Sequence, residues 1–389
     1  NRKLSGITIK IVIKMSKGSF FNKIGLADME KVHSSVIGWM FSDECEALSM
    51  ENKSDVINVM LNVQEEQSYK RISTQVEVDD IDILFSITTQ KGDVFDIIVE
   101  NKIKSSQHTN QLEKYKQREE KNSEKRNYYV FLTLIGEAAK TTGWESITYD
   151  CFLEAIKKVF ILNKENVDSI ILNEYLLSVE NLVSAKKSFL ENHTEYPNVF
   201  TDGGKKKQDK RTAGPDEKLY ISNNQLETIF QKLFYRTIIK EVQKKESLKL
   251  GNLCVNISES HGSADAGFFN GNDNSMRIPA EQEAGFYFDF AFQNGTFKVA
   301  ISKNYNHSTK KDRDAIEEWK DAFDAIREEY EYDRLNLGKG VKARISITKN
   351  IGKDWWRKSK EDIIETWSKE FVQMIEMKDK IIAKKMSGI

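Results

Sequence analysis

Cysteine, proline and long apolar runs are all scarce in this sequence of 389 residues. The three cysteines, Cys45, Cys151 and Cys254, are odd in number and far apart, without a CxxC pair or the Cys/His spacing of a zinc site. They argue against a disulfide framework and predict a reduced, cytoplasmic protein without structural zinc. No apolar run approaches the roughly 18 to 20 residues of a membrane-spanning helix, so we expect no membrane partner.

Several chemistry-bearing motifs are absent as well. The sequence has no Walker P-loop, glycine-rich dinucleotide loop, GxSxG elbow or HExxH. An ATP-driven or serine-hydrolase function therefore has no support. The net charge does not indicate a class of partner either, because the 59 lysines and arginines nearly balance the 60 aspartates and glutamates. A nucleic-acid partner would have to be held by local basic patches.

What is present describes a helix-rich globular protein of about two domains, with 39% hydrophobic and 31% charged residues. Met15 is a plausible natural start. Residues 1–14 are either native or foreign to the protein, and no prediction rests on them. We expect one domain over 15–196, a basic linker with proline and glycine over 197–216, and an α+β domain over 217–389.

The first half of the chain has a readable order of elements. Apolar residues at helical spacing over 27–64 predict two helices that break near Ser42 and Asp43. Three strands, a helix, a fourth strand and another helix follow, over 70–77, 80–88, 93–102, 106–121, 128–134 and 150–160. The turn from Gln90 to Asp93 predicts an antiparallel hairpin between the second and third strands.

Charged side chains meet at the end of this hairpin. Alternate residues of a strand share a face, so Glu100 and Lys102 point together after the apolar run of the third strand. Asp80 and Asp82 share a face of the preceding strand, and pairing brings Asp82 toward Glu100. Two such carboxylates repel unless a cation lies between them, and Mg²⁺ prefers an all-oxygen site. With a lysine beside them, the arrangement suits metal-assisted phosphodiester hydrolysis, although a solvated strand end gives the same triplet.

The wider pattern resembles the PD-(D/E)XK nuclease superfamily, and within it a prokaryotic branch with motifs close to IDILI, IIENKI and QLxxY. Here these read IDILF around Asp82, IIVENKI around Glu100 and QLEKY over 111–115. MEKVHSSVIGWMFSD and FLTLIGEAAKTTGWESITY resemble flanking segments of the branch. The resemblance covers about residues 25–160 and implies a restriction-endonuclease-like α-β-β-β-α-β core, an α/β fold. Ile81 stands where the family name has proline.

The resemblance implies roles for the matching positions. Asp82 and Glu100 would hold Mg²⁺ or Mn²⁺, and Lys102 would position the attacking water and stabilise the pentacovalent phosphate. Gln111 would complete the catalytic set. Further candidates are the supporting residues Glu30, His33, Asp80 and Tyr115 and the nucleic-acid contacts Lys104 and Lys114.

Some of these residues have a second interpretation. Tyr115 can simply pack its helix on the sheet, and His33 on an amphipathic helix is more often a satisfied buried histidine than a catalyst. Asp80 could replace Asp82 as a ligand if both face the same way. These alternatives stay open at the level of sequence.

The second half lacks a recognisable catalytic pattern. It predicts helices over 222–245, 311–334 and 359–385, strands over 253–258 and 341–348, and a hairpin over 285–303. Its alternating phenylalanines, Phe286 to Phe292, predict a core face. The basic and aromatic run at 353–358 suits nucleic-acid contact or a half-buried helix start.

The sequence therefore predicts a Mg²⁺-dependent deoxyribonuclease, an endonuclease, with a role in prokaryotic defence against phage or foreign DNA. Two alternatives remain: a catalytically inactive protein of the same fold that binds nucleic acid or acts as a sensor, and a ribonuclease. A homo-oligomer and a partner protein of a defence system are both open.

Overall fold

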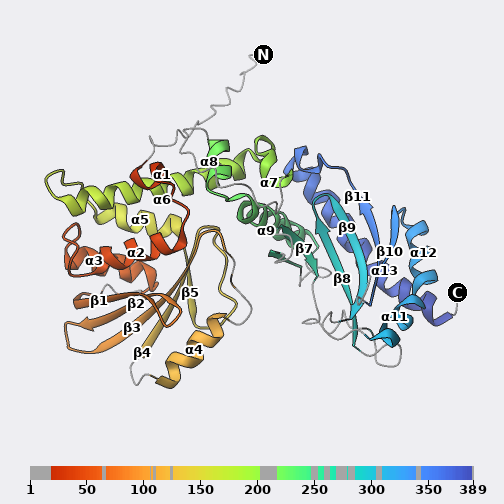
Figure 1. Cartoon of the computed structure of the whole chain (residues 1–389), viewed down its shortest axis with the longest axis horizontal. Coiled ribbons are helices and arrows are strands. Elements are labelled where there is room, and N and C mark those ends of the chain that lie inside the picture. Colours follow the sequence, from red (N-terminus) through yellow and green to blue (C-terminus); the bar gives the residue numbers. More distant parts are fainter. Residues whose placement is uncertain are drawn as a thin grey trace, which may run out of the picture. The chain divides into compact units, whose positions relative to one another are not determined.

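The computed structural model describes residues 19–63, 67–105, 107, 111–122, 126–201, 217–246, 253–257, 263–268, 278, 285–303, 309–338 and 343–387. They form two compact units (Figure 1). The first runs to Asn192 and includes 207–229, and the second holds 193–206 and 230–389. Residues 1–14 and residues 202–216 of the predicted linker lie outside the described part of the chain.

The first unit is built on a mixed five-stranded sheet. Its strands lie in sequence order: β1 (Tyr69–Val78), β2 (Ile81–Thr89), β3 (Val94–Lys102), β4 (Arg126–Thr133) and β5 (Trp144–Thr148). The first three are antiparallel to one another, whereas β3, β4 and β5 are parallel. Helix α4 (Gln111–Asn122) connects β3 to β4, as a parallel pair requires a crossover.

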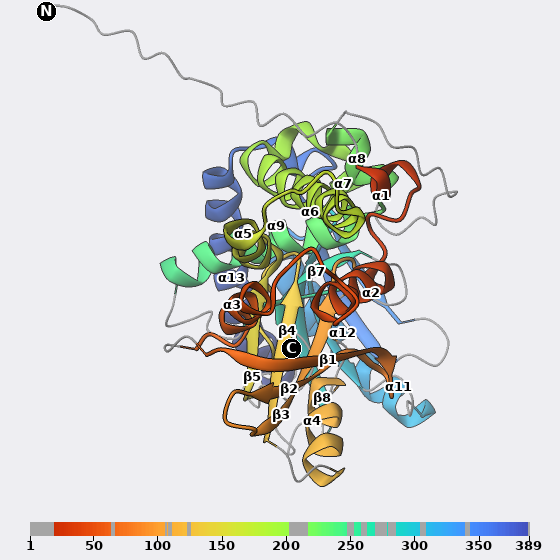
Figure 2. The ribbon, with the colours of Figure 1, turned by 90° about the vertical axis from the view of Figure 1, so that its left-hand side faces the viewer.

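Helices cover both faces of this sheet. Figures 1 and 2 show α2 (Glu30–Phe41), α3 (Met50–Met60), α5 (Tyr149–Val159) and α6 (Val167–Glu191) on one side and α4 on the other. The short helices α1 (Phe20–Lys23) and α8 (Glu217–Asn223) pack against α6. The predicted α/β class and the α-β-β-β-α-β order are thus confirmed, while β5 and α6 were not foreseen.

Local chemistry explains where the elements begin. Ser49, Thr148 and Asn166 each precede a helix and accept a hydrogen bond from a backbone N–H of its first turn. The loop between β1 and β2 is two residues long, and both have positive φ, 48° at Asp79 and 63° at Asp80. Such a turn matches the twist of a β-hairpin, and aspartate tolerates it better than most residues.

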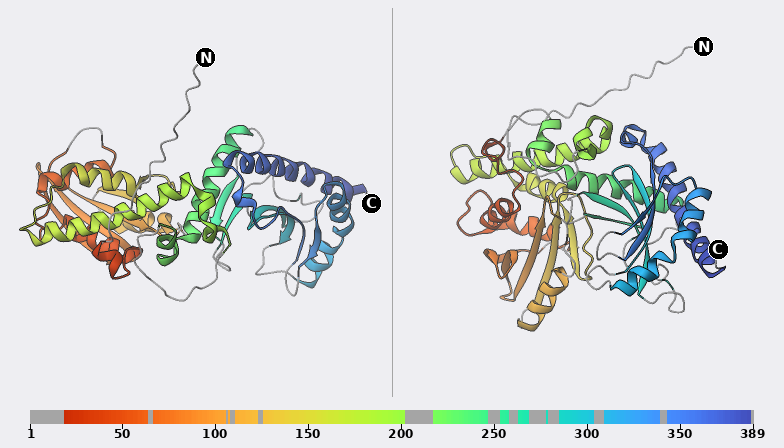
Figure 3. Two further views of the ribbon diagram at one scale, coloured as in Figure 1. Left: turned by 90° about the horizontal axis from the view of Figure 1, so that it is seen from above. Right: turned by 45° about the vertical axis from the view of Figure 1, so that its right-hand side comes forward.

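The second unit contains a six-stranded antiparallel sheet, in the order β10-β11-β9-β8-β7-β6. Its strands are β6 (Cys254–Ile257), β7 (Ala264–Phe268), β8 (Phe286–Gln293), β9 (Thr296–Lys303), β10 (Arg334–Leu337) and β11 (Arg344–Asn350). Its helices are η1 (His193–Glu195), α7 (Pro197–Thr201), α11 (Lys310–Glu317), α12 (Lys320–Glu329), η4 (Trp355–Arg357) and α13 (Lys360–Ser387), with most of α9 (Glu227–Lys245). Figure 3 shows α11, α12 and α13 gathered on one side of the sheet.

The phenylalanine stripe of β8 forms the core of this unit, as predicted. Phe292 lies 4.4 Å from Trp367 of α13 between ring centroids, and both are buried. Trp355 and Trp356, suggested above as nucleic-acid contacts, are each only 2% exposed. Trp356 stacks on Phe200 at 5.5 Å. That suggestion is wrong for the two tryptophans because neither ring is open to a ligand.

None of the helices that the structure describes is both long and apolar enough to cross a bilayer.

Candidate active site

Asp82, Glu100 and Lys102 meet at one end of the hairpin between β2 and β3. The pairing of Ile83 with Val99, continued by one residue, sets Asp82 across from Glu100. Because the two strands are antiparallel, the start of β2 lies beside the end of β3. The Asp82 carboxylate also accepts a hydrogen bond of 2.7 Å from the backbone N–H of Asn101.

Glu100 is the most enclosed member of the group, with 1% of its side chain exposed. Its Oε1 receives both the Lys102 ammonium at 2.5 Å and the Gln111 amide at 2.7 Å. Its Oε2 and the Gln111 Oε1 are buried, and neither finds a hydrogen-bond partner among the residues that the structure describes. Two acceptor oxygens thus remain for a donor or a cation.

Burial and nearby negative charges disfavour charge on both carboxylates. Desolvation and then the charge of Asp82 raise the pKa of Glu100 to about 7, against the opposing influence of Lys102. Desolvation likewise raises the pKa of Asp82, although the Asn101 N–H and Lys102 pull it down. Burial would lower the pKa of Lys102, but Glu100, Asp82 and Glu30 together raise it. A carboxyl pair with raised pKa values beside a charged lysine is typical of functional sites.

Helix α4 holds the site from one side. The Gln111 amide donates to the Tyr115 hydroxyl at 2.9 Å, and that hydroxyl donates to the Asp80 carbonyl at 2.8 Å. Tyr115 is buried in a cluster with Ile98, Leu112 and Phe131. It therefore both packs the helix and links it to the turn before Asp82.

The expectation that Asp80 and Asp82 alternate along one strand is wrong. Strand β2 begins at Ile81, and Asp80 lies in the preceding turn with an exposed side chain. Its left-handed backbone breaks the two-residue period on which the prediction rested.

Glu30 reaches the site from the opposite side, at the start of α2. Its Oε1 accepts hydrogen bonds from the backbone N–H groups of Ile103, Lys104 and Ser105, at 2.8 to 2.9 Å, and Ser105 Oγ bonds both of its oxygens. Burial opposes the charge, but these donors and Lys102 lower the pKa of Glu30 overall. The carboxylate thus fastens the chain after β3, a role that the sequence did not suggest.

His33 is a satisfied core residue. It is 1% exposed, and its ring nitrogens lie 3.1 Å from the Tyr175 hydroxyl and 2.9 Å from the Ala27 carbonyl. Desolvation lowers its pKa to about 4. The imidazole is therefore neutral. Among the described residues, it makes no hydrogen bond to Asp82 or Glu100.

A known family model matches the part of the chain that contains this group of side chains. Residues 19–187 match the family model of the PD-(D/E)XK nuclease superfamily. The match spans α1 to most of α6 and includes Asp82, Glu100, Lys102 and Gln111. It confirms the predicted resemblance to the superfamily. No curated protein and no solved structure matches the chain.

The PD-(D/E)XK match raises the question of whether Asp82 and Glu100 can bind a divalent cation. No group of three or more His, Cys, Asp and Glu residues within the described ranges is placed to hold a metal by itself. Asp82 and Glu100 supply two carboxylates, and Mg²⁺ commonly takes one or two of them and keeps several waters. The unpartnered Glu100 Oε2 and the raised pKa values fit such an ion, because a cation would relieve both.

The two candidate nucleic-acid contacts of the nuclease-superfamily domain differ. The Lys104 ammonium pairs with the fully buried Asp28 and keeps 26% of its side chain exposed. Lys114 lies on the exposed surface of α4. Of these two lysines, Lys104 forms an ion pair, and Lys114 forms none with the residues that the structure describes.

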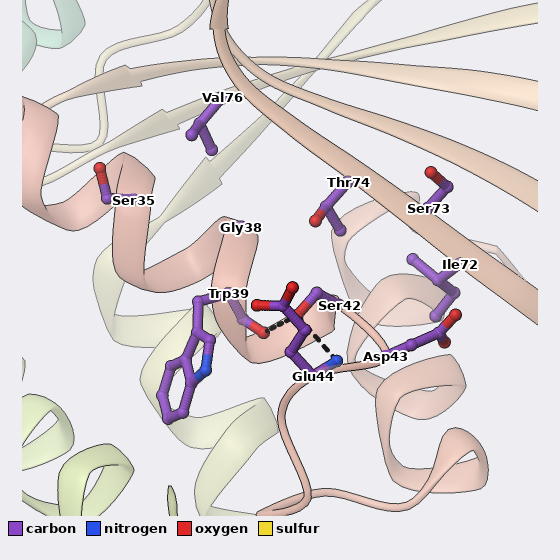
Figure 4. Close-up of a pocket in the computed structure, with 10 residues that line it drawn as sticks. All are labelled: Ser35, Gly38, Trp39, Ser42, Asp43, Glu44, Ile72, Ser73, Thr74 and Val76. Carbon is purple, nitrogen blue, oxygen red and sulfur yellow. Dashed lines mark hydrogen bonds between the residues drawn. The ribbon is translucent and has the colours of Figure 1, made fainter.

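A pocket of about 380 Å³ lies elsewhere in the same unit, between α2 and the edge strand β1 (Figure 4). Polar side chains and Trp39 line it, among them Ser35, Ser42, Asp43 and Thr74. It contains none of the site residues discussed above. The pocket and the cluster at the hairpin end are therefore separate features of the first unit.

Proposed function

We propose that the chain is a metal-dependent nuclease that hydrolyses phosphodiester bonds, with DNA as its substrate and Mg²⁺ or Mn²⁺ held by Asp82 and Glu100. The observation that carries the proposal is the pairing of the half-buried Asp82 with the buried Glu100, with Lys102 beside them and one Glu100 oxygen left without a partner among the described residues. The match to a nuclease superfamily points to nucleic acid as the class of substrate.

Each side chain has a definable task. A bound divalent ion would polarise a phosphate oxygen and lower the pKa of a bound water. Lys102, whose pKa is raised, stays protonated and can donate a hydrogen bond to the attacking water or to a phosphate oxygen. Gln111 orients the Glu100 carboxylate through its amide, and Tyr115 in turn holds Gln111.

Cleavage within a strand, and a part in prokaryotic defence against foreign DNA, complete the proposal. Both follow from the resemblance to the prokaryotic branch and stay predictions. The second unit is proposed to recognise a substrate, a partner or a trigger.

The test is cleavage of circular plasmid DNA, with a matched RNA substrate in parallel. We expect products with Mg²⁺, none with EDTA, and none from Lys102→Ala. Lys157→Ala is the matched control, since Lys157 is an exposed lysine on α5 that pairs with Glu180. Circular DNA reports cleavage within a strand, because an enzyme that needs free ends leaves it intact.

Equal products in all arms would show a contaminating activity and overturn the proposal. Salt-dependent binding without cleavage would favour the rival, an inactive protein of the same fold that binds nucleic acid. Cleavage of the RNA alone would reassign the substrate.

A further inference from the structure

Asn101, the residue between Glu100 and Lys102, uses every polar atom of its side chain. It is 0% exposed, and its side chain lies on the sheet face opposite the two charged neighbours. Its Oδ1 accepts from the Tyr149 hydroxyl at 2.7 Å, and its Nδ2 donates to the Glu30 carbonyl and to Ser34 Oγ, both at 3.1 Å. The Glu30 carbonyl can only accept, which fixes the orientation of the amide.

The backbone of the same residue contacts the site directly. The Asn101 N–H donates to Asp82 Oδ2 at 2.7 Å. One residue therefore joins the carboxylate of β2, on one face of the sheet, to helices α2 and α5 on the other. A displacement of the Asn101 side chain would be transmitted to Asp82 through this N–H and to Glu100 and Lys102 through the adjoining peptide bonds.

We propose that Asn101 is a positioning residue, and that Tyr149 holds it in place so that Asp82 and Glu100 stay at the spacing a shared cation requires. The inference rests on the proposed function for its consequence, but its physical content is the rigidity of one strand end. Tyr149 is buried, 48 residues away in sequence, and reaches β3 from the start of α5.

The fold offers a matched pair of variants. Tyr149→Phe and Tyr69→Phe each remove one buried hydroxyl of the first unit that donates to an asparagine side chain. Only the first leaves the Asn101 Oδ1 without its donor, whereas the Tyr69 hydroxyl donates to Asn58 Oδ1 at 2.9 Å. Both variants lose a buried hydrogen bond, so a purely structural effect on stability should be of similar size in the two.

The first measurement is backbone hydrogen exchange over residues 100–105 in the full-length protein. An unpaired buried acceptor loosens its neighbourhood, so we expect exchange about ten-fold faster in Tyr149→Phe than in the wild type. Tyr69→Phe should stay within about two-fold. The second is Mn²⁺ binding by titration calorimetry, where Tyr149→Phe should bind about ten-fold more weakly. The third is DNA cleavage, where kcat should fall about ten-fold with an unchanged KM, since Asn101 does not face the substrate.

Equal exchange rates over 100–105 in the two variants would overturn the inference, whatever the activity. Faster exchange in Tyr149→Phe with unchanged Mn²⁺ affinity and kcat would also overturn it, because the strand end would then be loosened without consequence for the site. A wild-type protein that cleaves nothing would refute the proposed function instead, and the exchange and Mn²⁺ measurements would still decide the role of Asn101.

Discussion

Each unit of the molecule buries a glutamate against a lysine, and the two pairs differ in one respect. In the first unit Lys102 lies 2.5 Å from Glu100, and in the second Lys349 lies 2.6 Å from Glu370. Both glutamates are nearly inaccessible, and each has an Oε2 without a hydrogen-bond partner among the described residues. Within the described parts of the two units, only Glu100 of these two glutamates is placed across from a second carboxylate, that of Asp82.

The difference teaches that a buried ion pair does not by itself mark a site. The Glu370 pair joins α13 to β11 and has one positive charge for one negative charge. The Glu100 group has two carboxylates for one lysine, with the carboxylate of Glu30 also near. Excess negative charge in a desolvated place is what attracts a divalent cation.

The sharpest test of this comparison replaces the lysine in each pair. Lys102→Ala should reduce metal-dependent cleavage at least about 100-fold, because it removes the group that we propose stabilises the developing charge. Lys349→Ala should leave cleavage within about two-fold and destabilise its unit by about 1 to 3 kcal/mol, since Glu370 is left buried and unpaired. Cleavage rates and denaturant unfolding measure the two effects. Equal loss of activity in both variants would contradict the assignment of the site.

A second test neutralises one half-buried aspartate in each sheet. Asp82→Asn should weaken Mn²⁺ binding at least about ten-fold in calorimetry, because an amide cannot replace a carboxylate beside Glu100. Asp265 of β7 is the counterpart: burial raises its pKa to about 6, against the pull of Lys298. Asp265→Asn should leave Mn²⁺ binding unchanged.

The Asp265→Asn variant also tests how the stability of the fold depends on pH. The pKa of Asp265 lies at about 6 in the folded chain and near 3.8 unfolded, so the folded state binds more protons between these values. Its contribution is present below pH 3.8 and is lost as the pH rises to 6. At pH 7, Asp265→Asn should therefore raise the free energy of unfolding by about 1 to 3 kcal/mol. An unchanged or lower free energy of unfolding would show that the charged form of Asp265 does not destabilise the folded state.

A third test compares a buried histidine in each unit. Burial lowers the pKa of His33 to about 4 and also lowers that of His193. The unfolded chain takes up more protons between pH 6.5 and 4, so stability falls as the pH drops through that window. His33 alone should account for up to about 3 kcal/mol. His33→Gln should flatten this dependence in denaturant unfolding at pH 5 and 7, and an imidazole that titrates near 6.5 by NMR would disprove it.

The smallest expected effect concerns exposed basic residues. Lys114→Ala on α4 should weaken DNA binding about two- to three-fold and reduce the salt dependence by about one counterion, because it removes one phosphate contact. Arg357→Ala in the second unit serves as the control, since Arg357 is 64% exposed and next to buried tryptophans. Binding is measured by fluorescence anisotropy at several salt concentrations. A larger effect from Arg357 would move the nucleic-acid surface to the second unit.

Sequence patterns predicted the core of the first unit well where the apolar residues of a helix or strand follow a single period. The apolar alternation of β2 and β3 and the helical spacing of α2 are strong local signals, and the structure has these elements within a few residues of the predicted bounds. β5 and α6 were missed: β5 is short, and the apolar residues of α6 run almost all round it, so neither shows a clear period.

The predicted site residues divide along similar lines. Four predicted residues lie on strands or a helix, where a period of two or of 3.6 residues determines the side to which each side chain points. The structure brings these four together: Asp82, Glu100, Lys102 and Gln111. The roles of Glu30 and Asn101 depend on partners 71 to 75 residues away or on the far face of the sheet. No spacing within the sequence encodes those contacts.

The sequence by itself determined which residue types could form a cation site and on which strands they lie, since alternation along a strand is a local property. Tertiary structure decided that Asp80 turns away, that Glu30 bonds the backbone after β3, and that His33 is a neutral core residue. These outcomes depend on which groups lose water and which donors reach them. Desolvation and long-range hydrogen bonds arise only when distant segments pack together.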